Sequence, residues 1–183
     1  MTRLAPLTLD EMTDQQRAVY EEFRAAHPRV GVAITHLTWM RSPELASLIA
    51  RFGSFLRYRC MDYRKRELAI LITGRAAKSP VEWYLHLPFA REAGIEEHII
   101  TALAEQRRPD FTSDEDAALY DVVTELMAGC KVSDATYQRA TEVLGSKQLV
   151  ELVAITGYYV MMAMQIGTFK FELPAGEKPA FAE

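Results

Sequence analysis

The sequence predicts an all-α protein of about eight helices. Apolar residues recur at helical spacing along most of the chain, whereas the strict alternation typical of half-buried strands is almost absent. Serine and threonine caps stand just ahead of several of these apolar segments. With 183 residues, 49% of them hydrophobic, the chain can bury one substantial core, so we expect a single domain spanning residues 1–183.

The first two predicted helices begin at recognisable caps. Thr13 and Gln16 have the spacing of a capping box, and Ser42 precedes a proline at the first helical position. Further starts and stops predict helices over about 64–77, 80–93, 96–104, 114–128, 134–144 and 147–169. The breaks between these segments are too short to be interdomain linkers.

The last predicted helix is long enough to span a bilayer, with Glu151 as its only charged residue between Leu149 and Phe169. Two glycines and a glutamine dilute its hydrophobicity, and central core helices are also apolar on nearly all faces. We therefore expect a core or subunit-contact helix and no membrane partner.

Charge and cysteine content exclude several classes of protein. The net charge is −4 and the basic residues are dispersed, so no footprint for nucleic acid is expected. The amino terminus lacks the apolar core of a secretory signal, which predicts a cytoplasmic location. Cys60 and Cys130 lie far apart without CxxC spacing, so neither a disulfide framework nor a zinc knuckle is indicated.

The segment from Glu67 to Gly94 carries the candidate chemistry. Glu67 lies in one predicted helix, while Glu82 and His86 lie one turn apart on the same face of the next. Two carboxylates and an imidazole in apolar surroundings suffice for acid/base catalysis. We therefore predict Glu67, Glu82 and His86 as the catalytic residues.

Glu82 and His86 also have plainer interpretations. Ser79 and Glu82 have capping-box spacing, so Glu82 serves either to start a helix or as a carboxylate held ionised by the helix amino terminus at a pocket mouth. His86 is either a satisfied core histidine or one half of an acid/base pair with Glu82.

Glu67 lies in a run of leucine, alanine and isoleucine residues. Its carboxylate either pairs with Arg64 or Arg66 at the helix start or turns inward toward His86. Burial would then raise its pKa and make it a proton store.

These residues carry a resemblance to a known family. The run from Arg66 to Ile70, the EWxxH pattern from Glu82 to His86, and the HxxxAxxxG spacing that ends at Gly94 are similar to the carboxymuconolactone decarboxylase family. That family belongs to the alkylhydroperoxidase D (AhpD) superfamily. The resemblance covers about residues 36–170 and implies an AhpD-like bundle of antiparallel helices that assembles into a homo-oligomer, a trimer or hexamer.

Peroxidase members of this superfamily carry a glutamate, two cysteines and a histidine at fixed spacing. Glu67 and His86 match the outer two positions, but Ser79 and Glu82 occupy the cysteine positions. Reduction of peroxide requires the thiolates, so a thiol peroxidase is not expected. The resemblance does imply a proton relay between Glu67 and His86.

Together these observations predict a cofactor-independent lyase of the carboxymuconolactone decarboxylase type. Loss of carbon dioxide leaves an enolate-like carbanion, which His86 would protonate while Glu67 recharges it and Glu82 orients the imidazole or the substrate. No metal or organic cofactor is required. The same groups suit isomerisation or retro-aldol cleavage, and Val160 stands where the family often has asparagine, so the substrate is expected to differ.

The expected substrate is a small carboxylated lactone or aromatic-derived compound. An arginine, Arg64 or Arg75, would hold its carboxylate in an aromatic pocket. The candidate aromatic residues are Trp39, Phe55, Tyr58, Trp83 and Tyr84.

Two alternatives stay open at this point. A metal-dependent enzyme could use Glu67, Glu82 and His86 as oxygen and nitrogen ligands. A non-catalytic, ligand-binding oligomer could retain only the fold.

Overall fold

The computed structural model describes residues 2–27 and 31–182, and its regular elements there are all helical, as predicted. A 3₁₀ turn, η1 (Leu9–Glu11), comes first. The α-helices are α1 (Asp14–Ala26), α2 (Ile34–Trp39), α3 (Pro43–Tyr58), α4 (Tyr63–Ala76), α5 (Pro80–Glu92), α6 (Glu97–Ala104), α7 (Asp114–Gly129) and α8 (Asp134–Phe169).

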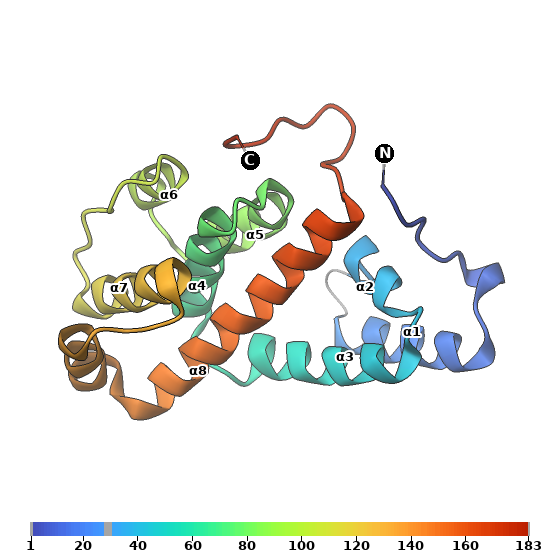
Figure 1. Cartoon of the computed structure of the whole chain (residues 1–183), viewed down its shortest axis with the longest axis horizontal. Helices are drawn as coiled ribbons and strands as arrows, with labels where there is room; N and C mark the ends of the chain where they lie inside the picture. Colours follow the sequence, from blue (N-terminus) through green and yellow to red (C-terminus); the bar gives the residue numbers. More distant parts are fainter. Residues whose placement is uncertain (1, 28–30, 183) are drawn as a thin grey trace.

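Helix α8 runs diagonally through the molecule between two groups of helices (Figure 1). Helices α1 to α3 lie on one side of it, and α4 to α7 lie on the other. Helix α4 is the centre of the second group, because it packs against α5, α7 and α8. Its residues from Arg66 to Gly74 are all buried, so Glu67 needs polar partners inside the protein.

Several predicted helix starts are confirmed. The Gln16 amide donates to Thr13 Oγ1 at 3.3 Å, and the Thr13 amide donates to Gln16 Oε1 at 2.9 Å, which completes the capping box of α1. The helices predicted over 114–128 and from 134 begin at the caps Ser113 and Ser133, whose side chains accept from the Asp116 and Thr136 amides. The short α2 was not predicted.

The predicted helices 134–144 and 147–169 join as α8, with a bend at Gly145. Its φ of 78° and ψ of 158° are not helical, and glycine adopts this conformation without strain. Of the described helices, α8 is the one long and apolar enough to cross a membrane, but 56% of that apolar window is buried inside the protein. This burial agrees with the expected core helix.

Candidate functional site

A pocket of about 280 Å³ opens beside the carboxyl-terminal half of α8, and we call it the α8 pocket. Helices α2, α3, α5 and α8 supply most of its lining. The polar lining groups are His27, Thr35, His36, Arg57, Glu82 and His86, and the aromatic ones include Phe89, Tyr158 and Tyr159. A mostly apolar pocket with a few polar groups is typical of small-molecule sites.

The structure brings Glu67 and His86 together. His86 Nδ1 donates to Glu67 Oε2 at 2.8 Å, with the carboxylate fully buried on α4 and the imidazole 7% exposed on α5. A carboxylate can only accept, so Nδ1 carries the proton and Nε2 is left without a bond to any described residue. His86 lines the α8 pocket, and the bond to Glu67 fixes its tautomer and orientation.

Glu67 has both of the partners that were considered as alternatives. Arg66 Nε donates to Glu67 Oε1 at 3.1 Å while His86 occupies the other oxygen. Burial opposes ionisation, but the hydrogen bond from His86 and the charges of His86 and Arg66 hold the pKa of Glu67 below its ordinary value. The expectation of a raised pKa was therefore wrong, and Glu67 is a fixed carboxylate.

Glu82 has the opposite environment. It is 2% exposed, its Oε2 has no hydrogen-bond partner among the described residues, and burial raises its pKa well above the ordinary value. The predicted capping box with Ser79 is absent, because Ser79 makes no side-chain cap bond and no described residue bonds its hydroxyl. Burial therefore favours the neutral acid at this wall of the α8 pocket, against the interpretation of Glu82 as a carboxylate held ionised.

Two tyrosines of α8 complete this wall. The Tyr159 ring lies edge-on to the His86 ring, with centroids 5.0 Å apart. Burial raises the pKa of Tyr158 to about 12, so its hydroxyl stays protonated. A Cβ at Gly53 would lie 2.5 Å from this hydroxyl, so α3 needs glycine where Tyr158 approaches it.

The other wall contains a histidine pair that the sequence analysis missed. The rings of His27 and His36 stack 5.5 Å apart, and the Phe23 ring lies 4.4 Å from His36. Burial lowers the pKa of His27 and lowers that of His36 to about 3, so both are neutral. The single signal in the sequence is that two of its four histidines lie within ten residues, which predicts no contact.

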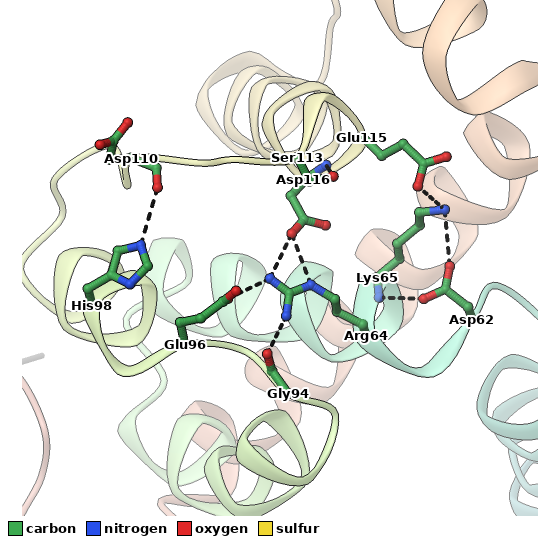
Figure 2. Close-up of polar contacts among 10 residues, drawn as sticks. All are labelled: Asp62, Arg64, Lys65, Gly94, Glu96, His98, Asp110, Ser113, Glu115 and Asp116. Carbon is green, nitrogen blue, oxygen red and sulfur yellow. Dashed lines mark hydrogen bonds and ion pairs between the residues drawn. The ribbon is translucent and has the colours of Figure 1, made fainter.

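The predicted arginines lie elsewhere. Arg64 Nη2 lies 2.9 Å from Asp116 Oδ2 and 2.6 Å from Glu96 Oε2, and Nη1 donates to the Gly94 carbonyl (Figure 2). Arg75 donates to the Ala104 carbonyl. Neither lines the α8 pocket, and this corrects the expected substrate contact for both; Arg57 is the arginine that lies there.

The predicted aromatic residues also lie outside the pocket lining. Trp83 is 2% exposed and packs edge-on against Phe181, with centroids 5.4 Å apart. Tyr58 and Phe55 are exposed, and Trp39 and Tyr84 are half-buried. The aromatic lining comes instead from Phe89, which lies on α5 with His86, and from Tyr158 and Tyr159 on α8.

The arrangement gives no support to the metal-dependent alternative. Across residues 2–27 and 31–182, no three histidine, cysteine or acidic side chains converge as a metal site would require. Both cysteines also lie away from the pocket, Cys60 buried and Cys130 exposed.

No protein-family model and no curated protein matches the chain. Solved structures do. The debrominase Bmp8 without ligand aligns at 13% identity and a TM-score of 0.74, covering 93% of this chain and 91% of that one. A cysteine-to-alanine variant of Bmp8 in complex with 2,3,4-tribromopyrrole aligns at 13% identity and 0.75, covering 96% and 93%.

A third structure is ATU0492 from Agrobacterium tumefaciens, a protein of unknown function whose description relates it to the antioxidant defence protein AhpD. It aligns at 16% identity with a TM-score of 0.64, covering 75% of this chain and 96% of that one. The fold is therefore AhpD-like and all-helical, as the sequence resemblance implied. At 13–16% identity the likeness establishes the fold alone, so the reaction has to be inferred from the residues of the site.

Proposed function

We propose that this protein is a cofactor-independent lyase that uses proton transfer to decarboxylate a small carboxylated carbonyl compound or lactone. The observation that carries the proposal is the 2.8 Å bond between Glu67 and His86 at the wall of the α8 pocket. It orients one imidazole nitrogen and leaves the other for a substrate.

In the proposed reaction, the bond to the carboxylate carbon breaks and carbon dioxide leaves. The electron pair passes to the carbon conjugated with the carbonyl, and protonated His86 delivers the proton from Nε2 to that carbon. The Glu67 carboxylate opposes the positive charge of the imidazolium throughout. Solvent then returns the proton to His86, so no oxidant or reductant is consumed.

Glu82 has a defined role in this scheme. A buried carboxyl that stays protonated can donate a hydrogen bond to the carbonyl oxygen as enolate charge develops. Its environment favours that role because no described cation or hydrogen-bond donor contacts its Oε2. Isomerisation or retro-aldol cleavage would use the same three groups.

An enzymatic role agrees with Bmp8, a debrominase of the same fold. Thiol chemistry is not part of the proposal, because neither cysteine of the chain lies in the α8 pocket.

We also propose that the protein forms a homo-oligomer through α3. Four of its apolar side chains at helical spacing are 40–57% exposed: Leu45, Leu48, Phe52 and Phe55. Light scattering of wild type and of Leu48→Glu tests this, and a wild-type monomer at micromolar concentration would contradict it.

The catalytic proposal is tested by incubating the protein in D₂O with a panel of carboxylated lactones and keto acids. Carbon dioxide release and deuterium at the carbon that lost it are the readouts. We expect His86→Ala to lower turnover by about 10²- to 10⁴-fold. His98→Ala is the matched control, since His98 is exposed and bonds the Asp110 carbonyl outside the pocket. Full turnover by His86→Ala would overturn the proposal.

A further inference from the structure

Arg57 lies in the last turn of α3 and lines the α8 pocket. Its guanidinium carbon lies 5.1 Å from the centroid of the Phe89 ring, which lines the same pocket. Stacking on an aromatic ring restricts the guanidinium plane without using its hydrogen-bond donors. The group is therefore held in place with its donors still available.

Among the described residues, two of the three other arginines that are not fully exposed are paired with carboxylates. Arg64 pairs with Asp116 and Glu96, and Arg66 pairs with Glu67. Arg57 has no carboxylate within ion-pair distance among the described residues. It is also the one lysine or arginine among the described lining residues of the pocket.

The other lining groups do not balance its charge. Burial raises the pKa of Glu82 and lowers the pKa of the neighbouring His27 and His36, so it favours the neutral form of all three. Burial dominates the pKa of His36 and of Tyr158, and the positive charge of Arg57 contributes to both. The charge of Arg57 therefore acts on groups of both walls, the one with His36 and the one with Tyr158. Glu67 lies behind His86, and its two oxygens are bonded by His86 and Arg66; of the charges that lower its pKa, that of Arg57 contributes least.

We infer that Arg57 is the substrate-recognition residue of the α8 pocket and binds a carboxylate that the product keeps. A guanidinium presents two parallel donors to a carboxylate and holds it in a fixed plane. A carboxylate held in this way is poorly placed to leave, because its ground state is stabilised. The departing carboxylate therefore occupies the apolar part of the pocket, and the retained one fixes the reacting carbon relative to His86. This inference rests on the proposed function.

Benzoate and benzamide test the inference, because they have the same shape and differ in charge. Binding to the full-length protein is measured by calorimetry and by competition with turnover. We expect Arg57→Gln to weaken benzoate binding by about tenfold or more, since a charged hydrogen-bonded pair is lost. Benzamide binding should change little, and Arg57→Lys should bind benzoate with intermediate affinity. With a turned-over substrate, Arg57→Gln should raise KM more than it lowers kcat.

The matched control is Arg59→Gln, two residues along the chain. Arg59 is exposed, lies over the Phe55 ring and does not line the α8 pocket. Circular dichroism and Tm establish that each variant folds. Benzoate binding that is unchanged in Arg57→Gln, or absent from wild type up to the solubility limit, would overturn the inference.

The two proposals fail separately. If Arg57→Gln binds benzoate as wild type does while His86→Ala abolishes turnover, the recognition role of Arg57 is contradicted and the proton-transfer function is supported. If Arg57→Gln loses benzoate binding while His86→Ala keeps turnover, carboxylate binding by Arg57 is supported and the proton-transfer function is contradicted.

Discussion

His86 and His36 face the same pocket from helices on either side of α8 (Figure 1). His86 has a carboxylate 2.8 Å from Nδ1. His36 has aromatic neighbours, and its Nδ1 is buried without a hydrogen-bond partner among the described residues. Both histidines line the pocket, yet among the described residues only His86 has a carboxylate hydrogen-bonded to its ring.

The difference lies in the residue behind each ring. Without a carboxylate, burial disfavours the imidazolium and lowers the pKa of His36 to about 3. The bond from His86 and the charges of His86 and Arg66 hold the pKa of Glu67 below its ordinary value, and beside such a carboxylate an imidazole can carry a proton during a reaction. The α5 wall is therefore suited to chemistry, and the wall formed by His27 and His36 is suited to packing against an apolar, planar part of a ligand.

The largest effect is expected when the carboxylate behind His86 is neutralised. Glu67→Gln keeps the shape of the side chain but removes the charge that stabilises imidazolium. We expect turnover to fall by about 10²- to 10⁴-fold. Steady-state kinetics of Glu67→Gln, His86→Ala and the double variant measure this.

The double variant should be about as slow as either single variant, because residues that act as a unit are not additive. His36→Gln is the control on the opposite wall and should change kcat little. Comparable losses of kcat in His36→Gln and Glu67→Gln would contradict the division between the two walls.

The sequence predicted one wall of this pocket and missed the other. Glu67, Glu82 and His86 lie within twenty residues on two helices joined by a short turn, so spacing and family resemblance were enough to group them. His36, Arg57 and Tyr158 meet only because α2, α3 and α8 pack together, and no local pattern encodes that packing.

The direction of the pKa shift of each buried glutamate could not be predicted from the sequence either. Burial was expected to raise the pKa of Glu67, and one of the two interpretations of Glu82 was an ionised carboxylate, but each pKa is shifted in the other direction. What decides the direction is whether a donor reaches the buried oxygens: Arg66 and His86 reach Glu67, and no described residue reaches Glu82 Oε2. Fold class and cap positions were predictable because both depend on local propensity.

A smaller effect on stability is expected from Glu82→Gln. The folded pKa of Glu82 is raised above the ordinary 4.5, so its contribution to stability is present below pH 4.5 and is lost as pH rises toward the folded value. Glutamine does not ionise, so Glu82→Gln should raise Tm at pH 7 and leave it nearly unchanged at pH 4.

Thermal denaturation from pH 4 to 8 measures this difference. Glu92→Gln, at the exposed carboxyl end of the same helix, is the comparison variant. A Glu82→Gln protein less stable than wild type at pH 7 would mean that the carboxyl is ionised and partnered in the folded state.

The smallest effect is expected from His36→Gln, on the loss of stability in acid. Burial lowers the pKa of His36 to about 3 in the folded protein, from an ordinary value of 6.5. Its contribution to stability is therefore present above pH 6.5 and is lost as pH falls toward 3. His27, whose pKa burial also lowers, contributes in the same direction. Wild type should lose Tm on acidification from pH 6.5 to 4.5, and His36→Gln should lose less. The slope of Tm against pH is the readout, with His98→Gln as the exposed control. An unchanged slope in His36→Gln would show that this wall accepts charge, and the two histidines would no longer differ in kind.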